Sequence, residues 1–413
     1  MKVLFIGYSD FNGGAARATY WLAQGLRSKG IDVEFLVEQK VTDNYWIKTY
    51  HKNLFERVLF KIENLILKYI KSKNSSHWSL NFSWNSDLIN QVEQFNPDVI
   101  NFHWIGNSTI PLKLLNKFKK PIIWSLYDMW PFTAGCHYDN FCGKFETGCN
   151  NCPQLNFKVD LSAKIFNLKN RAFKNSRIRF VSPSIWLKDI AYSSKIIIDN
   201  NLEVDVIPHG TDLKVYNNLE KSLCRNILNL SDHNRYLLFG SMSGINDQRK
   251  GFQYLVPALK ILSEMGVYSD VKILIFGENE PEVGVDLGFD IQYLGRIADD
   301  ITLKIIYSAS DLLITPSMQE AFGMTASEAM ACGTPVVAFN IAGAKDVIDH
   351  KINGYLVESF DINDLVRGIE WGINNLGFDV SNAARNKCID KFSLENIAER
   401  YIQLYSNQIS SNL

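Results

Sequence analysis

The segment 311–339 constrains the fold of this chain more than any other. It opens with the apolar run Asp311-Leu-Leu-Ile-Thr315, passes through a glycine-bearing loop and a helix of small residues to Cys332, and ends in the apolar run Val336–Phe339. Gly333-Thr-Pro335 stops the helix before the second run. A strand–helix–strand unit of this kind predicts a parallel sheet with helices packed on its faces.

The same alternation of strands and helices runs through the whole chain. Strands are predicted at 2–8, 31–37, 98–103, 121–127, 178–182, 204–207, 236–240, 271–276, 291–294, 311–315 and 336–339. Helices are predicted near 15–28, 252–265, 301–309 and 361–375. A chain of 413 residues exceeds what one hydrophobic core usually organises. We therefore expect an α/β protein with two Rossmann-like, doubly wound domains, 1–208 and 209–390, followed by a terminal helical segment, 391–413. The boundary is placed at the turn cluster Ile207-Pro-His-Gly210.

Composition narrows the class of protein. Hydrophobic residues make up 46% and charged residues 21% of the chain, as in soluble globular proteins, and the net charge of −1 gives no bulk attraction to nucleic acid. No apolar run approaches the ~18 residues of a membrane-spanning helix, and the first residues lack the features of a cleavable signal. These features predict a cytoplasmic protein whose thiols stay reduced.

Two carboxylates flank the loop after the strand at 311–315. Glu320 precedes the loop and Glu328 lies eight positions later, on the helix. Phe322, Gly323, Met324 and Thr325 form the turn that opens this helix, where free backbone amides suit a phosphate and the carboxylates suit sugar hydroxyls. A structural interpretation is also open: Thr325-Ala-Ser-Glu328 fits a capping box, and Glu320 fits a solvated loop residue.

A second loop carries positive charge. The segment 239–252 leads from a strand through a glycine-bearing loop to Arg249 and Lys250, directly before a helix. Two cations beside helix-terminal amides favour binding of a pyrophosphate, although two solvated cations in front of a helix are the alternative.

Together these segments are similar to the E-x7-E motif and the Lys-Gly loop of retaining glycosyltransferases of family 4. The resemblance implies a GT-B fold, in which two Rossmann-like domains face each other across a cleft. It implies that Glu320 lies near the transferred sugar, that Glu328 holds the ribose, and that Lys250, with Arg249, holds the diphosphate. Arg296 and Ile297 match a loop that contacts the base through backbone groups, with an ordinary strand end as the alternative. Ser241 stands where many members carry an arginine.

The first half carries the acceptor side of this resemblance. Gly13 and Gly14 open a helix after the first strand and match a glycine pair that lies against the donor and acceptor, unless they serve packing alone. His103 ends a buried strand, and Asp128 follows the next strand, where an acceptor hydroxyl is expected. A satisfied strand-end histidine is the alternative for His103. Tyr127 replaces the histidine that related transferases carry before this aspartate.

Four cysteines cluster in the loop 136–152. Cys136, Cys142, Cys149 and Cys152 have a spacing that could close a tetrahedral structural zinc site, while disulfides and buried free thiols remain open. A similar cysteine insertion occurs in family 4 enzymes of exopolysaccharide and O-antigen synthesis.

The segment 51–73 is predicted to form a basic amphipathic helix. Six Lys or Arg residues against two Glu residues leave it a local charge of +4. One hypothesis is a helix that contacts anionic membrane carrying a lipid-linked acceptor; a packing helix with a solvated basic face is the alternative.

The resemblance therefore implies a retaining glycosyltransferase that moves a sugar from a nucleoside diphosphate sugar to a saccharide acceptor, lipid-linked, in bacterial surface polysaccharide synthesis (lipopolysaccharide or exopolysaccharide). The family needs no catalytic metal, and the sequence has no Asp-x-Asp near a predicted donor strand. Other interpretations are a nucleotide-sugar epimerase or hydrolase of the same fold, and a non-catalytic nucleotide-sugar binding protein.

Overall fold

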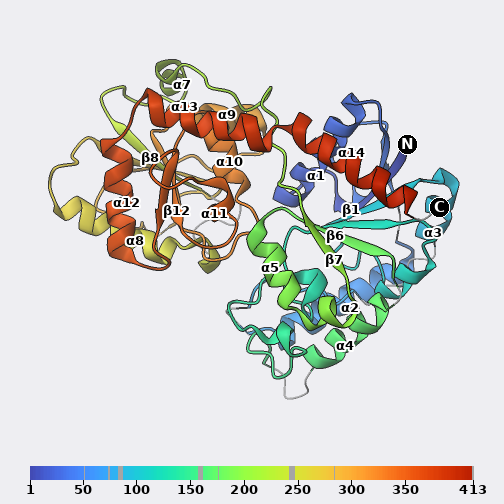
Figure 1. The fold of residues 1–413 in the computed structure, drawn as a ribbon. Coiled ribbons are helices and arrows are strands. Elements are labelled where there is room, and N and C mark those ends of the chain that lie inside the picture. Colours follow the sequence, from blue (N-terminus) through green and yellow to red (C-terminus); the bar gives the residue numbers. More distant parts are fainter. Residues whose placement is uncertain are drawn as a thin grey trace. The chain divides into compact units, whose positions relative to one another are not determined.

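The computed structural model describes residues 1–50, 52–72, 75–81, 87–156, 161–174, 176–240, 247–282 and 284–411. The chain divides into two compact units (Figure 1). One contains Met1–Pro208 with Glu395–Leu413, and the other contains His209–Leu394.

The first unit is built on a seven-stranded parallel sheet. Its strands follow the order β3-β2-β1-β4-β5-β6-β7. Their bounds are β1 (Lys2–Ser9), β2 (Asp32–Gln39), β3 (Ile47–Thr49), β4 (Val99–His103), β5 (Ile122–Ser125), β6 (Ile178–Ser182) and β7 (Glu203–Val206). The order reverses direction at β1, as in doubly wound sheets, so the carboxyl ends of β1 and β4 flank a topological switch point.

Helices of the first unit are α1 (Gly14–Ser28), α2 (Leu54–Ile70), α3 (Asp87–Phe95), α4 (Leu161–Phe173), α5 (Ile185–Ser193), α6 (Lys195–Asp199) and α14 (Leu394–Ser410), with short 3₁₀ turns at Leu112–Lys117, Trp130–Phe132 and Lys144–Glu146. The terminal helix α14 packs on the first sheet (Figure 1). Tyr401 and Tyr405 of α14 are buried, and the Tyr405 hydroxyl accepts a hydrogen bond of 2.6 Å from the Asn101 side chain on β4.

The second unit is built on a six-stranded parallel sheet. Its order is β10-β9-β8-β11-β12-β13. The strands are β8 (Arg235–Gly240), β9 (Val271–Phe276), β10 (Ile291–Tyr293), β11 (Leu312–Thr315), β12 (Val336–Phe339) and β13 (Gly354–Val357). The helical elements are α7 (Lys221–Ile227), η5 (Gln248–Lys250), α8 (Phe252–Glu264), α9 (Asp300–Ala309), α10 (Met324–Ala331), α11 (Ala344–Val347), α12 (Ile362–Asn374), α13 (Phe378–Lys387) and the π-helical turn η6 (Cys388–Phe392).

The predicted α/β class with two doubly wound sheets is confirmed. β11 and β12 pair in parallel, as the segment 311–339 predicts. In the second sheet the order reverses at β8, which places the ends of β8 and β11 side by side. β8 is followed by the loop that carries Arg249 and Lys250, and β11 is followed by the loop that carries Glu320. Among the described residues, no helix is long and apolar enough to cross a membrane.

Candidate active site

Arg249, Lys250 and Glu320 meet at the carboxyl ends of β8 and β11. The Lys250 Nζ lies 2.5 Å from Glu320 Oε2, and Arg249 Nη1 lies 3.6 Å from the same oxygen. Arg249 also donates 2.8 Å hydrogen bonds to the Gln319 carbonyl and to the Asp247 carboxylate, which fix its direction. The sequence separation of 70 residues between Lys250 and Glu320 is closed by the pairing of their strands. Ser241 lies outside the described residues.

The charge state of Glu320 follows from these contacts. Burial alone raises the pKa of Glu320, but the neighbouring Lys250 and Arg249 outweigh it and leave the pKa below its usual value. Glu320 is therefore a carboxylate at neutral pH, with a side chain that is 26% exposed. Arg249 and Lys250 together face two carboxylates, Glu320 and Asp247, so the charges of this loop pair balance.

The backbone around Lys250 is tightly constrained. Gly251 has a φ of +77° and begins α8 as its N-cap. A Cβ atom at this position would lie 1.8 Å from the carbonyl oxygen of Pro316, so only glycine lets the two loops approach this closely. The Met318 amide donates a 2.7 Å hydrogen bond to the Arg249 carbonyl and joins the loops a second time. The cations and Glu320 are thus held on one rigid platform.

Helix α10 begins at the predicted turn, but without the capping box of the alternative structural interpretation. Its N-cap is Gly323, with a φ of +100° and no side-chain cap. Thr325 therefore lies inside the first turn, so the capping-box interpretation of Thr325 and Glu328 is wrong. Glu328 is buried, and one of its oxygens accepts a 2.8 Å hydrogen bond from the Tyr307 hydroxyl on α9.

The remaining donor-side candidates differ in exposure. Phe322 is buried edge-to-face against the His209 ring, with centroids 5.6 Å apart, whereas Met324 and Thr325 are half-exposed at the helix start. Burial lowers the pKa of His209 to about 3 against an opposing effect of Glu320, so this imidazole is neutral near pH 7.

Arg296 and Ile297 lie in the loop after β10, with Arg296 exposed and Ile297 half-buried. Their loop is joined to β9 through the Gly277 amide, which donates to the Gly295 carbonyl at 2.8 Å. β9 lies between β8 and β10 in the sheet, so this loop stands at the same edge as Lys250 but two strands further out.

In the first unit, Gly13 and Gly14 stand in open space. Gly13 is the N-cap of α1 with a φ of +95°, which explains a glycine there. A Cβ atom added to either residue would meet no atom within 4 Å, so packing against the chain explains neither glycine. The packing interpretation of Gly14 is therefore unsupported, and the position is open to a ligand that approaches the backbone.

His103 is buried at the end of β4. Its Nδ1 lies 3.1 Å from the Tyr127 hydroxyl, which in turn lies 2.8 Å from the Thr19 hydroxyl on α1. Burial raises the pKa of Tyr127 well above its usual value, so this phenol stays protonated and cannot serve as a base near neutral pH.

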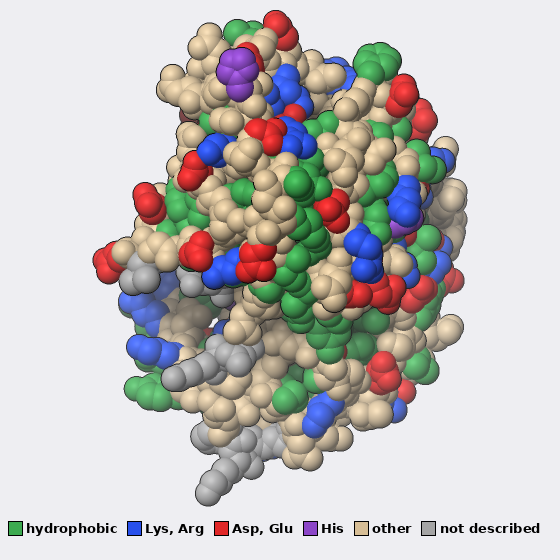
Figure 2. All heavy atoms as spheres, turned by 90° about the vertical axis from the view of Figure 1, so that its left-hand side faces the viewer, with side chains coloured by type: hydrophobic (Ala, Val, Ile, Leu, Met, Phe, Trp, Pro, Cys, Tyr) green, Lys and Arg blue, Asp and Glu red, His purple; other side chains and the backbone are tan. Residues whose placement is uncertain are grey.

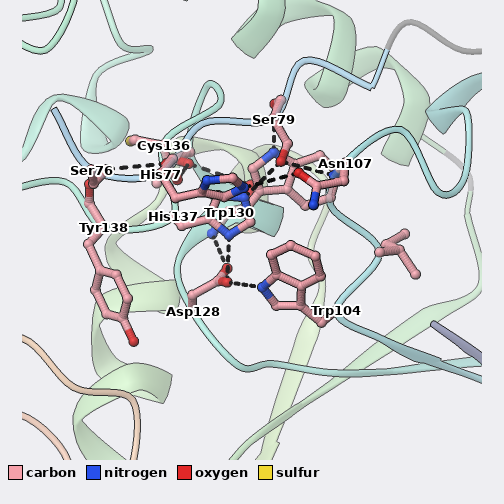
Figure 3. A network of polar contacts seen from close by, with 12 residues as sticks. Ser76, His77, Ser79, Trp104, Asn107, Asp128, Trp130, Cys136, His137 and Tyr138 are labelled. Carbon is pink, nitrogen blue, oxygen red and sulfur yellow. Dashed lines mark hydrogen bonds and ion pairs between the residues drawn. The ribbon is translucent and has the colours of Figure 1, made fainter. Parts of the chain in front are cut away.

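Asp128 is an organising residue of the loops around β4 and β5 (Figure 3). Its Oδ2 accepts hydrogen bonds from Trp104 Nε1 at 2.8 Å and His137 Nδ1 at 2.6 Å, and its Oδ1 accepts one from the Trp130 amide at 2.9 Å. Burial alone raises the pKa of Asp128, but His137 and these donors lower it below its usual value. Both oxygens of this carboxylate are already engaged within the protein.

His137 is a partner that the sequence analysis missed. Its second ring nitrogen, Nε2, lies 2.9 Å from the Ser79 hydroxyl, so the three side chains form a buried relay from Ser79 through His137 to Asp128 (Figure 3). Ser79 is 1% exposed, so its hydroxyl cannot reach a substrate and does not serve as a nucleophile. The signal in the sequence was the histidine directly after Cys136, nine positions from Asp128.

The four clustered cysteines do not form a metal site in this arrangement. They are free thiols, and no group of three or more His, Cys, Asp or Glu side chains in the described ranges is arranged to hold a metal ion. Burial raises the pKa of all four, that of Cys149 to about 12, so without a metal these thiols are protonated at neutral pH. The described arrangement of these thiols does not fit the zinc site expected from their spacing, and metal analysis of the purified protein is the test.

Part of the second unit matches the model of a known protein family. Residues 234–375 match the family model described as "Glycosyl transferases group 1". This segment contains Arg249, Lys250, Glu320 and Glu328. An uncharacterized glycosyltransferase of Methanocaldococcus jannaschii is 30% identical over 195 residues, which are 45% of this chain and 48% of that protein. The chain spans about half the length of the curated relatives that it matches.

Solved structures resemble the whole chain. Sucrose-phosphate synthase from Thermosynechococcus elongatus has a TM-score of 0.70 and 18% identity over 100% of both chains. HepE from Anabaena, solved in complex with UDP-glucose, has a TM-score of 0.67 and 16% identity over 98% of this chain and 100% of that one. At such low identities, the similarity to these structures shows the fold alone. Together with the two parallel sheets of this chain, it identifies the GT-B fold.

Proposed function

We propose that this protein is a glycosyltransferase that transfers a sugar from a nucleoside diphosphate sugar to a saccharide acceptor with retention of configuration. The observation that supports this most is the cluster of Lys250, Arg249 and Glu320 at adjacent strand ends of a glycosyltransferase group 1 domain. A similar fold that binds UDP-glucose supports the class of donor.

The donor would lie with its diphosphate at Lys250 and Arg249. As the bond between the sugar and the diphosphate breaks, negative charge grows on the leaving phosphate oxygens, and two fixed cations plus the first amides of α10 stabilise it. Side chains and backbone amides thereby stabilise the negative charge of the leaving diphosphate, so the proposal needs no catalytic metal. The acceptor hydroxyl attacks the anomeric carbon on the face that the diphosphate leaves, and its proton passes to the leaving phosphate oxygen.

Glu320 and Glu328 have separate roles in this proposal. Glu320, which is 26% exposed, orients the sugar hydroxyls. Glu328 holds the ribose while the Tyr307 hydroxyl fixes its carboxylate in place. Gly13 and Gly14 let the ligand approach the α1 backbone, and His103 and Asp128 support the acceptor side of the first unit. Asp128 would act by holding Trp104 and His137 in place, since its oxygens are occupied.

The acceptor in this proposal is lipid-linked, and the pathway is the synthesis of a bacterial surface polysaccharide such as lipopolysaccharide or exopolysaccharide, in the cytoplasm. A panel of radiolabelled UDP-, ADP- and GDP-sugars, each with and without a bacterial lipid extract as the source of acceptor, tests it. We expect labelled product only when the extract is present. Labelled free sugar or epimer formed without the extract would indicate a hydrolase or epimerase, and a shift in thermal stability without turnover would indicate a binding protein.

A further inference from the structure

Helix α2 is packed against the first unit by its glutamates. Glu56 and Glu63 are each 2% exposed, and Leu67 and Ile70 on the same side of the helix are also buried. Glu63 accepts hydrogen bonds from the Leu80 amide at 2.8 Å, from the Asn81 amide, and from the Ser108 hydroxyl. Glu56 forms a capping box with Asn53 at the start of the helix. The acidic side of this helix therefore faces inward.

The apolar side of α2 faces outward. Six large apolar side chains on this side have exposed fractions between 45% and 81%: Leu54, Phe55, Val58, Ile62, Leu65 and Tyr69. Apart from Phe55, which lies beside the others, they follow one another at spacings of four, four, three and four residues. These spacings place the side chains on one face of a helix. A packing helix would bury this face, so the packing interpretation of 51–73 is wrong for these six residues.

Positive charge borders the apolar stripe. Arg57, Lys61 and Lys68 are exposed on the adjoining side of α2, and both acidic residues of the helix are buried. On the face drawn in Figure 2, by contrast, acidic and basic side chains are interspersed. The outer side of α2 thus combines large apolar groups with cations and lacks any exposed carboxylate of its own helix.

The orientation is fixed by the fold. Rolling α2 to bury its apolar stripe would take Glu63 away from two backbone amides and a hydroxyl, and these buried donors would lose their acceptor. Exposed apolar patches of this kind mark interaction surfaces. We propose that the outer face of α2 is a docking surface for an anionic membrane, with the apolar side chains inserted at the headgroup boundary and the three cations beside lipid phosphates.

Charge complementarity favours a membrane over a second copy of the chain. A two-fold self-contact would bring the same three cations of both copies together without a carboxylate to offset them. An anionic leaflet instead attracts each cation. The inference concerns where the protein is held and does not depend on sugar transfer, so it stands or falls separately from the proposed function.

Co-sedimentation of the full chain with vesicles tests the proposal. We expect binding to vesicles of phosphatidylcholine with phosphatidylglycerol at low salt, weaker binding at high salt, and little binding to phosphatidylcholine alone. Each lysine near the surface strengthens binding about fivefold, so Lys61→Gln with Lys68→Gln should weaken it about 25-fold.

The apolar part is tested by Phe55→Ser with Leu65→Ser. Its matched control is Ile185→Ser with Ile198→Ser, which removes two side chains of 57% and 62% exposure from other helices of the same unit. We expect at least a tenfold loss of binding for the first pair, none for the control, and unchanged thermal unfolding for both. Wild-type protein that stays in the supernatant, or equal binding by the two pairs, would overturn the proposal. A dimer in vesicle-free buffer that only the Phe55 and Leu65 substitutions dissociate would also overturn it and indicate self-association.

Discussion

The pair formed by Lys250 and Glu320 leads to a prediction in which binding and transfer change in opposite directions. Without a donor, the ammonium group lies 2.5 Å from the carboxylate, and both side chains are largely buried, with 19% and 26% exposure. A bound diphosphate has to compete with Glu320 for the same cation. Glu320→Gln removes this competitor but keeps the size of the side chain.

The expected size of the effect follows from the exposure of the pair. Two unit charges 4 Å apart interact by about 4 kcal/mol at an effective dielectric constant of 20. Desolvation and residual solvent screening reduce the net contribution of a partly exposed pair to about 1 kcal/mol. Release of Lys250 should therefore tighten binding of the nucleoside diphosphate about fivefold. Transfer should fall about 100-fold, because the sugar loses the carboxylate that orients it.

Titration calorimetry with UDP, ADP and GDP measures binding, and the labelled-sugar assay measures transfer. Asp290→Asn is the matched control, because it removes the carboxylate partner of Lys272 in the same unit, on the neighbouring strand β9. We expect neither readout to change in that variant. If Glu320→Gln binds the diphosphate more weakly than the wild type, Glu320 does not compete for Lys250. If it transfers sugar at the full rate, Glu320 has no role in the reaction.

Four other predictions concern the stability of the donor side, Asp128 and Gly14 on the acceptor side, and the cysteines. Because the pKa of Glu320 is lower in the folded protein, its contribution to stability is present above the unfolded pKa near 4.5 and is lost as pH falls. The free energy of unfolding of Glu320→Gln should therefore decline less than that of the wild type between pH 6 and pH 3. Parallel declines of the two proteins would contradict this. Asp128→Asn should lower the free energy of unfolding in urea by about 3 kcal/mol, because it weakens the hydrogen bonds of a buried carboxylate with three donors. The control Asp43→Asn, at an exposed position, should lower it by less than about 0.5 kcal/mol. Equal losses in the two variants would show that Asp128 does not organise the surrounding loops. Gly14→Ala should keep or raise stability by up to about 1 kcal/mol but lower transfer, since the added methyl meets only a ligand, and full activity would show that no ligand approaches there. Metal analysis of the purified protein should find less than one zinc per chain, and a full equivalent would instead restore the zinc site predicted from the cysteine spacing.

The sequence predicted the donor-side geometry because local patterns and one topological rule are sufficient there. Strand periodicity located β8 and β11, and strands of a doubly wound sheet present their carboxyl ends at one edge. That rule brings Lys250 and Glu320 together without any knowledge of side-chain contacts. The short strands β3 and β13 were missed, because three or four residues carry too little periodicity.

The first unit was harder to predict, because its key contacts join segments far apart in the chain. The engagement of Asp128 depends on Trp104, 24 residues away, and on a histidine in the cysteine loop. Periodicity showed that α2 has an apolar side but could not show which side faces the core. That choice is made by hydrogen bonds between Glu63 and the segments around residues 80 and 108, which no local pattern reveals.

The central claim is that Lys250 holds the diphosphate of a nucleotide-sugar donor. The most direct measurement is calorimetric binding of the nucleoside diphosphate to the wild type and to Lys250→Met, with Lys272→Met as the control for loss of a paired lysine in the same unit. We predict that Lys250→Met weakens binding at least tenfold and that Lys272→Met binds like the wild type. Equal affinity of Lys250→Met and the wild type would contradict the claim.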